Sequence, residues 1–271
     1  MSQFLRDIKI SNVNVTEQML QAINEFLAGK MSSTNKAIDA QGISEQEKSE
    51  QRLDLFYVIR FDNRGYRLYD PQEAFRFYQQ ASEVERVIFT LDSIQSERTN
   101  RMYGTFCELR FDANDPNNCI IQVSSDDGDA VDSMYNGLLE IISKSKSLSG
   151  WARTAWTQLL VQILGVASGF VLSLIAAIKI SPYLKIDNNF VLSFIFAFLI
   201  FSNAWGFINQ QILSLINYSF PNIRFSREGK SSFNWLTQAV VGGLFVALFL
   251  FFFGQIMGWV GSILGAFIVG R

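Results

Sequence analysis

The sequence predicts two parts: an α+β domain with an antiparallel sheet over residues 1–150, fused to an α-helical transmembrane bundle over residues 151–271. Three observations support this division. Of the 48 charged side chains, 39 precede residue 151. The second part contains three long stretches without Asp, Glu, Lys or Arg. The first part instead shows short alternations of apolar and polar residues separated by turn signals, a pattern typical of strands.

The first elements of the chain form a strand and a helix. Residues 4–10 alternate as a strand does, and residues 16–27 read as a helix that begins at Thr16 and ends at Gly29. Residues 31–52 are rich in Ser, Gln and Glu, which predicts a loop or a solvated helix.

A regular pattern begins at Leu53. Residues 53–61 and 66–69 read as a hairpin around a turn at Asn63-Arg64-Gly65, and Pro71 begins a helix that reaches residue 81. Three more strands are expected at residues 84–91, 102–111 and 119–124, with a turn at 115–118, and a last helix at 130–143. The sum of these elements is a compact α+β domain.

The charge-free stretches cover residues 154–178, 188–223 and 231–270. A helix of about 20 apolar residues crosses the hydrocarbon core of a bilayer, so each stretch is long enough to span. We expect spans at residues 157–180, 190–216 and 236–269. The last is long for a simple crossing and forms either one tilted helix or two pieces broken near Gly254.

Basic residues that flank the spans predict the orientation. The richer clusters, Lys144, Lys146 and Arg153 before the first span and Arg224, Arg227 and Lys230 after the second, belong on the cytoplasmic side. The N-terminus shows no run long enough for a secretory signal. We therefore expect a multi-pass protein of the cytoplasmic (inner) membrane, with the N-terminal domain in the cytosol.

Polar and small residues form stripes on the predicted spans, at the 3.6-residue helical period. The stripe on the second span consists of Asn203, Gly206, Gln210, Ser214 and Asn217. That on the third includes the close-packing glycines Gly254, Gly258, Gly261 and Gly265. Either the stripe on the second span packs against other helices, or it lines a conduction path, which would require several copies of the chain. The span interiors lack ionisable groups, which argues against active transport.

The residue inventory excludes most familiar catalytic chemistry. The chain has no His, and its two cysteines, Cys107 and Cys119, are too few for a four-cysteine zinc site and read as buried thiols. No phosphate-binding glycine motif occurs. The acidic run at residues 126–132 precedes a helix, so it favours capping over a calcium site. No enzyme activity, cofactor or metal ion is expected.

Residues 1–150 carry 16 basic and 23 acidic side chains, a net charge of −7, which disfavours long duplex nucleic acid. A short anionic ligand in one local basic pocket remains compatible with this charge. The ligand-binding candidates are Arg60, Arg64, Arg67, Arg98, Arg101 and Arg110. The alternative is that these side chains form surface salt bridges with Asp54, Asp62, Asp70 and Asp112.

Two functions are compatible with this organisation. The preferred hypothesis is a non-enzymatic, oligomeric membrane effector: an ion channel gated by a ligand or partner, which dissipates the membrane potential. The alternative is a non-conducting membrane anchor or assembly scaffold whose sheet binds another protein. A membrane enzyme acting on lipid is disfavoured because the spans contain no carboxylate and the chain no His.

The overall outline, an acidic α+β domain followed by Phe-rich spans, resembles prokaryotic membrane effectors of nucleotide-signalling antiphage systems. It is similar in size and domain order to the membrane effector of the Hailong defence system. The resemblance covers the whole chain as an outline and rests on no diagnostic motif. It implies a multimeric ion channel in bacterial antiphage defence, controlled by a partner nucleotidyltransferase and a short oligonucleotide product.

Overall fold

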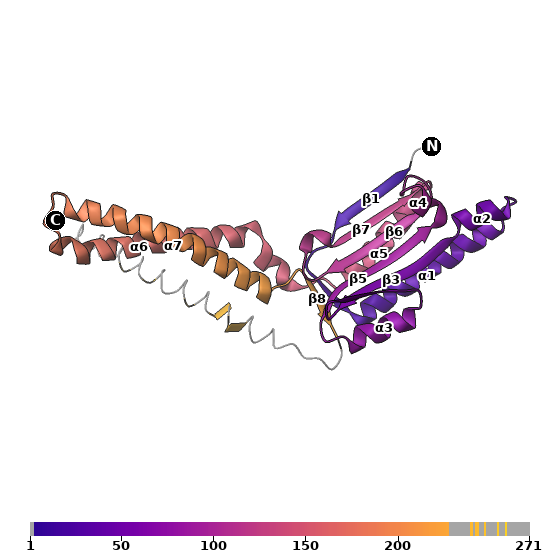
Figure 1. The fold of residues 1–271 in the computed structure, drawn as a ribbon, viewed down its shortest axis with the longest axis horizontal. Coiled ribbons are helices and arrows are strands. Elements are labelled where there is room, and N and C mark those ends of the chain that lie inside the picture. Colours follow the sequence, from indigo (N-terminus) through magenta and orange to yellow (C-terminus); the bar gives the residue numbers. More distant parts are fainter. Residues whose placement is uncertain are drawn as a thin grey trace. The chain divides into compact units, whose positions relative to one another are not determined.

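The computed structural model describes residues 3–227 and, beyond them, positions 239, 240, 242, 243, 247, 254 and 258. The chain divides into two compact units (Figure 1). We call them the α+β unit, with described residues 3–150 and 221–227, and the helical unit, which contains residues 151–220. The chain therefore leaves the α+β unit at Gly150 and returns to it at Pro221.

The α+β unit contains one antiparallel six-stranded sheet. Its strand order is β1 (Phe4–Lys9), β7 (Ile120–Ser125), β6 (Phe106–Asp112), β5 (Val84–Ser93), β3 (Leu53–Phe61) and β4 (Arg64–Leu68). Three helices lie against one face: α1 (Glu17–Asp39), α3 (Pro71–Gln80) and α5 (Gly128–Ser143) (Figure 1). The predicted antiparallel sheet domain is confirmed, and among the described residues one face of its sheet carries no long helix.

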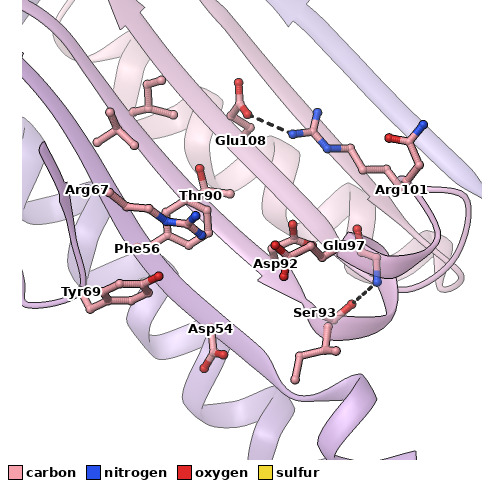
Figure 2. Close-up of a pocket in the computed structure, with 15 residues that line it drawn as sticks. Asp54, Phe56, Arg67, Tyr69, Thr90, Asp92, Ser93, Glu97, Arg101 and Glu108 are labelled. Carbon is pink, nitrogen blue, oxygen red and sulfur yellow. Dashed lines mark hydrogen bonds and ion pairs between the residues drawn. The ribbon is translucent and has the colours of Figure 1, made fainter. Parts of the chain in front are cut away.

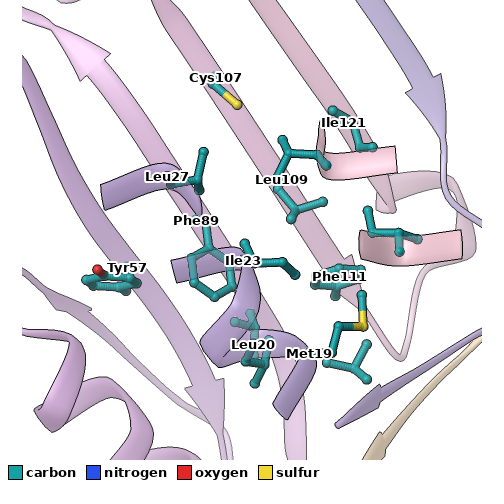
Figure 3. Close-up of a cluster of buried hydrophobic side chains, with 14 of the residues drawn as sticks. Met19, Leu20, Ile23, Leu27, Tyr57, Phe89, Cys107, Leu109, Phe111 and Ile121 are labelled. Carbon is teal, nitrogen blue, oxygen red and sulfur yellow. The ribbon is translucent and has the colours of Figure 1, made fainter. Parts of the chain in front are cut away.

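The hydrophobic core lies between the sheet and these helices. Leu20, Ile23 and Leu27 recur along α1 at helical spacing and are buried against the strands (Figure 3). Phe89 and Leu109 contribute the inward residues of the two central strands. Because successive residues of a strand point to opposite faces, residues between the inward positions are directed to the other face of the sheet.

Helix α1 is longer than the sequence indicated. The prediction that it ends at Gly29 is wrong, because the helix continues to Asp39. A glycine inside a helix costs only about 1 kcal/mol relative to alanine. The side chain of Asn35 bonds both the N–H (2.8 Å) and the C=O (3.0 Å) of Leu53, and Ile38 is buried. These contacts stabilise the last turns of the helix.

Other boundaries differ by a few residues. The hairpin turn is Asp62-Asn63, both with positive φ, and Arg64 and Gly65 already belong to β4. The strand expected to start at residue 102 begins at Phe106. The polar segment 31–52 contains the end of α1 and a second helix. That second helix, α2 (Glu45–Gln51), has no buried residue and agrees with the solvated-helix alternative, and η1 (Pro116–Asn118) lies within the predicted turn. Short helices not predicted from the sequence are α4 (Ile94–Arg98), η2 (Leu148–Arg153) and η3 (Ser181–Tyr183).

The helical unit contains two helices long and apolar enough to cross a membrane: α6 (Ala155–Ile180) and α7 (Asn189–Ser219). Only 28% of the most apolar window of the first and 11% of that of the second are buried. Large side chains such as Phe196 and Phe207 are exposed on them, unlike the side chains of a core helix. A membrane association is compatible with these helices. The third span, expected at residues 236–269, lies almost entirely outside the described residues.

A second, two-stranded sheet joins distant parts of the sequence. β2 (Val13–Thr16) pairs in parallel with β8 (Ile223–Ser226), the segment that follows α7. The hydroxyl oxygen of Tyr78, from α3, lies 3.0 Å from the carbonyl oxygen of Val15 in β2 and 3.1 Å from that of Ser226 in β8. Its single hydrogen is shared between these two acceptors. Residues 223–226 are thus an integral part of the α+β unit.

Candidate functional site

The face of the sheet without long helices carries a cavity of about 460 Å³ (Figure 2). Its floor is formed by outward residues of β3, β5 and β6, and α4 with the loop that follows forms one wall. The lining side chains that matter chemically are Asp54, Phe56, Arg67, Tyr69, Asp92, Ser96, Glu97, Arg101 and Glu108. A cavity of this size is typical of small-molecule sites.

Local capping fixes the wall of the cavity. The hydroxyl of Ser93 accepts the N–H of Ser96 at 3.2 Å and that of Thr105 at 3.2 Å, which ties both ends of the loop to β5. Gly104 has φ +82°, and a Cβ there would lie 2.6 Å from Ser93 Oγ. Its N–H donates to the carboxylate of Asp126 at 3.1 Å. Only glycine suits this close approach at a positive φ.

Two arginines of the cavity lie over aromatic rings. The Arg67 guanidinium is 3.9 Å from the ring centroid of Phe56, and Arg101 is 3.7 Å from that of Phe106. Arg101 also forms an ion pair with the buried Glu108 at 3.4 Å. Stacking on a ring holds a guanidinium flat and leaves its edge available for hydrogen bonds.

Carboxylates outnumber guanidinium groups in the cavity. Asp54 and Asp92 are directly opposite each other on β3 and β5, and neither forms an ion pair among the described residues. Burial raises the pKa of Asp92, while a hydrogen bond from the Ser96 side chain and the charge of Arg101 act in the opposite direction. The end of the cavity near α4 is therefore acidic.

The six candidate arginines do not form one cluster. Arg67 and Arg101 line the cavity, and Arg110 pairs with Glu108 at 2.6 Å. Arg60 pairs with Glu85 and Arg98 with Glu50, both at 2.7 Å. Arg64 lies on the edge strand β4 and forms no ion pair within the described residues. The arrangement brings only two of the six arginines to the cavity.

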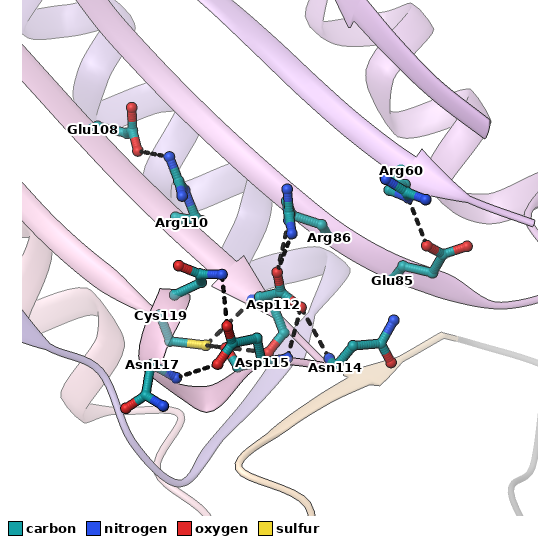
Figure 4. A network of polar contacts seen from close by, with 11 residues as sticks. Arg60, Glu85, Arg86, Glu108, Arg110, Asp112, Asn114, Asp115, Asn117 and Cys119 are labelled. Atoms are coloured by element: carbon teal, nitrogen blue, oxygen red, sulfur yellow. Dashed lines mark hydrogen bonds and ion pairs between the residues drawn. The ribbon is translucent and has the colours of Figure 1, made fainter. Parts of the chain in front are cut away.

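Three of the four aspartates considered as partners of the candidate arginines bind other groups. Asp70 caps α3 by accepting the N–H of Gln72, and Asp62 accepts the N–H groups of Ser82 and Glu83. Asp112 pairs with Arg86 at 2.6 Å and accepts the N–H groups of Asn114 and Asp115 (Figure 4). The expected salt bridging occurs for four of the six arginines, but with glutamates.

The capping interpretation of the acidic run is confirmed at Asp127, whose carboxylate accepts the N–H of Asp129 at the start of α5. In the part of the chain that the structure describes, no group of three His, Cys, Asp or Glu side chains is arranged to hold a metal ion.

Both cysteines are free and buried, as expected. Cys119 donates to the carbonyl oxygen of Asp112 at 3.1 Å (Figure 4).

The polar stripe of α7 faces away from α6. Its members are all exposed: Asn203, Gly206, Gln210, Ser214 and Asn217. The face of α7 that packs on α6 instead carries Ala197, Trp205 and Ile216. Trp205 fits against Gly165, where a Cβ would lie 1.5 Å from the indole Nε1. Gly165 of α6 is therefore a packing residue. The polar stripe of α7 is exposed in the described part of the chain.

The packing glycines expected on the third span are only partly described. Gly254 and Gly258 are helical, and a Cβ at either would meet no atom within 4 Å. Gly261 and Gly265 lie outside the described residues. Their expected role in close helix packing stays a prediction.

The α+β unit binds both segments that connect it to the helical unit. On the entry side, the N–H of Asn14 donates to Ser145 O at 2.9 Å and the N–H of Ser147 donates to Asn12 O at 2.7 Å. On the exit side, β8 pairs with the same strand, β2. The side chain of Arg227 also donates to the carbonyl oxygens of Ala81 and Ser82. Strand β2 is thus the common partner of both connections.

Sequence reasoning missed the acidic and aromatic residues of the cavity. Asp54 and Asp92 occupy outward positions of strands, and Asp is depleted in strands, so this placement was a readable signal. Phe56 also lies on a strand position that a core does not require, and Tyr69, directly after β4, is exposed. No protein-family model, curated protein or solved structure matches the chain significantly, so its function must be argued from these sites.

Proposed function

We propose that the chain is an oligomeric membrane protein in which a ligand at the sheet-face cavity controls ion conduction through assembled α7 helices. The single observation that carries this proposal is that β2 binds both connections to the helical unit. A displacement of β2 therefore moves the segment before α6 and the segment after α7 together. Coupling of this kind needs a ligand that distinguishes two states of the protein.

A continuous structural link runs from the cavity to β2. Asp54 of the cavity directly follows Leu53, whose backbone is bonded by Asn35 near the end of α1. The same helix is capped by Thr16, the last residue of β2, whose side chain accepts the N–H of Met19. A helix of 23 residues thus connects the strand that forms the cavity with the strand that holds both connections. A displacement of β3 by a ligand is transmitted along α1.

Conduction is proposed along the stripe Asn203, Gly206, Gln210, Ser214 and Asn217. Polar side chains in hydrocarbon require partners, and this stripe has none from α6. The amide of Asn203 bonds the carbonyl oxygen of Leu199, which leaves part of its bonding capacity free. Two or three helices enclose too little space for water, so several copies form the path. A neutral lining gives weak ion selectivity and dissipates the membrane potential.

The wider setting follows from the resemblance in outline. We propose an inner-membrane location with the α+β unit in the cytosol, and a role in bacterial antiphage defence with a nucleotidyltransferase and a short oligonucleotide as partners. Support for this setting is the order of the two units and the excess of acidic residues in the first 150 positions.

A scaffold without conduction is the second candidate. It is favoured by β1, an edge strand whose six residues are all exposed and whose free backbone edge is able to accept a strand of another protein. In that case the exposed stripe of α7 is only a packing surface.

Ion flux from liposomes tests the proposal. We expect the paired substitution Asn203→Leu and Gln210→Leu to lower flux at least tenfold, measured with and without a short single-stranded oligonucleotide. The matched control replaces exposed apolar residues of the same helix, Ile200→Leu and Phe207→Leu, and should conduct like the wild type. Unchanged flux in the first pair would refute the conduction path, and absence of flux in every wild-type condition would favour the scaffold.

A further inference from the structure

Exposed aromatic side chains gather at the end of the helical unit where α6 begins and α7 ends. Trp151, Trp156 and Tyr218 are 66%, 73% and 73% exposed. Each combines a large apolar ring with one polar N–H or O–H group, so water alone is a poor solvent for most of its surface. Side chains of this kind favour the headgroup layer of a bilayer, where apolar and aqueous surroundings meet.

Contacts within the helical unit hold this end in place. The ring of Trp151 packs edge-on against Phe220, with 5.8 Å between the ring centroids. The carbonyl oxygen of Trp151 accepts hydrogen bonds from the hydroxyl groups of Thr154 and Thr157, both at 3.0 Å. Arg153 Nη1 donates to the carbonyl oxygen of Phe220 at 3.1 Å. The backbone around Trp151 is thus bonded to the start of α6 and to the end of α7, which fixes the position of its ring along the two helices.

The opposite end of α6 lies at the distance expected for a second headgroup layer. Lys179 and Tyr183 are exposed there, Tyr183 by 86%. Lys179 follows Trp156 by 23 residues. That separation is about 35 Å along a helix, slightly more than the roughly 30 Å of a hydrocarbon core. Apart from Gln158 and Gln162, every exposed side chain of α6 between these two residues is apolar.

The apolar surface of α6 is too wide for one neighbouring helix. Phe170, Val171 and Leu172 are consecutive and all exposed. Because successive residues of a helix are about 100° apart, these three side chains span about 200° of its circumference. A single helix contact covers only a stripe of neighbouring positions. Lipid chains, which surround a helix, fit this surface better than a second copy of the chain does.

The packing of the two helices gives the depth of a further tryptophan. Trp205 of α7 lies against Gly165, which follows Trp156 by nine residues. A rise of 1.5 Å per residue places the level of Trp205 about 14 Å from that of Trp156, close to the middle of a core of roughly 30 Å. Two tryptophans of the same helix pair therefore differ in depth by about half of the core.

We propose that the exposed faces of α6 and α7 bind a phospholipid bilayer with Trp151, Trp156 and Tyr218 in one headgroup layer and Trp205 near the bilayer centre. Lys179 and Tyr183 then lie at the other headgroup layer. The proposal rests on the proposed function only in taking the chain as a membrane protein. It adds which side chains contact the lipid and at what depth.

Quenching of tryptophan fluorescence by brominated lipids tests these depths. The full chain, reconstituted in liposomes, keeps one of its five tryptophans, either Trp156 or Trp205, and the other four are replaced by Phe. We expect lipid brominated near the headgroup to quench Trp156 at least twofold more than lipid brominated near the end of the acyl chain does. Trp205 should show the reverse order, which makes each variant the matched control of the other. Thermal unfolding against the wild type shows whether both variants fold.

The outcomes separate this inference from the proposed function. Absence of lipid quenching at both tryptophans overturns the proposal and the membrane location together. Quenching of both with the same depth profile, or with Trp156 deeper than Trp205, overturns the depths and leaves the membrane location standing. Quenching of Trp205 alone shows that a second copy covers the aromatic end, which also contradicts the proposal. If the depths are as expected but the liposomes show no ion flux, the bilayer contacts stand and conduction fails.

Discussion

The side chain of Asn222 bonds the backbone around Asn12, although 210 residues separate the two. Its Oδ1 accepts the N–H of Asn12 at 3.0 Å, and its Nδ2 donates to the carbonyl oxygen of Ile10 at 3.3 Å. Asn222 is buried and lies directly before β8. The amide side chain of Asn222 thus bonds backbone groups just before β2. These bonds align the segment that returns from α7 with β2.

Replacing Asn222 by alanine should destabilise the α+β unit. The substitution leaves the N–H of Asn12 without its acceptor, at a cost of about 1–3 kcal/mol. For a protein of this size we expect the Tm in detergent to fall by about 2–10 °C. Gln72→Ala on the exposed surface of α3 is the control and should leave the Tm within about 1 °C of the wild type. Equal Tm values for the two variants would show that the Asn222 bonds contribute nothing.

A disulfide between β2 and β8 should block gating. Asn14 and Arg224 are register partners on these adjacent strands, so cysteines at these two positions are close enough to join. We expect oxidation of Asn14→Cys/Arg224→Cys to abolish the change in liposome flux on ligand addition and a reductant to restore it. Each single cysteine variant serves as the control. If the oxidised double variant responds normally, β2 does not couple the two units.

The contact between Gly165 and Trp205 should tolerate no side chain. A Cβ at Gly165 would overlap the indole ring, so Gly165→Ala forces α6 and α7 apart, at a cost of about 1–3 kcal/mol. Gly206→Ala is the matched control, because a Cβ there meets no atom within 4 Å. Thermal unfolding in detergent should show a lower Tm for the first variant alone. A lower Tm for both variants would point to altered lipid contacts instead, because alanine favours a helix more than glycine does.

The stability of the chain should depend on pH through Asp92. Burial raises the pKa of this carboxyl above its ordinary value of 3.8, so the folded state binds a proton more tightly than the unfolded state. Stability therefore falls as pH rises from the unfolded to the folded pKa, and the full penalty applies at neutral pH. Asp92→Asn should remove this decline, measured as urea midpoints from pH 4 to 7. An identical pH profile for wild type and variant would contradict the assignment.

Both thiols should resist alkylation in the folded protein. Burial raises the pKa of Cys107 to about 12, and it also raises the pKa of Cys119. The thiolate is the reactive species, so neither cysteine should react appreciably with N-ethylmaleimide at pH 8. Mass spectrometry should find two adducts after denaturation and none before. Rapid labelling of the native chain would show that one strand of the sheet opens.

The sequence patterns predicted the sheet because strands such as β3 alternate between buried and more exposed residues and because the turns contain Asn and Asp. They failed where distant contacts decide the structure. β8 has only four residues, Ile223–Ser226, in a basic connection, and becomes a strand because β2 and Tyr78 bind it. Helix α1 continues beyond Gly29 because Asn35 bonds the backbone of Leu53 and Ile38 is buried. The cavity was missed because the search for a ligand site followed arginines, whereas its unpaired charges are aspartates.

The position of β8 in the chain has a consequence for biosynthesis. Residues 221–227 complete the α+β unit but are translated only after both apolar helices. While the ribosome is making α6 and α7, the binding surface of β2 is empty on the exit side, and Val13 and Val15 lack their strand partner. The domain that emerges first is therefore completed only after α6 and α7 have been translated.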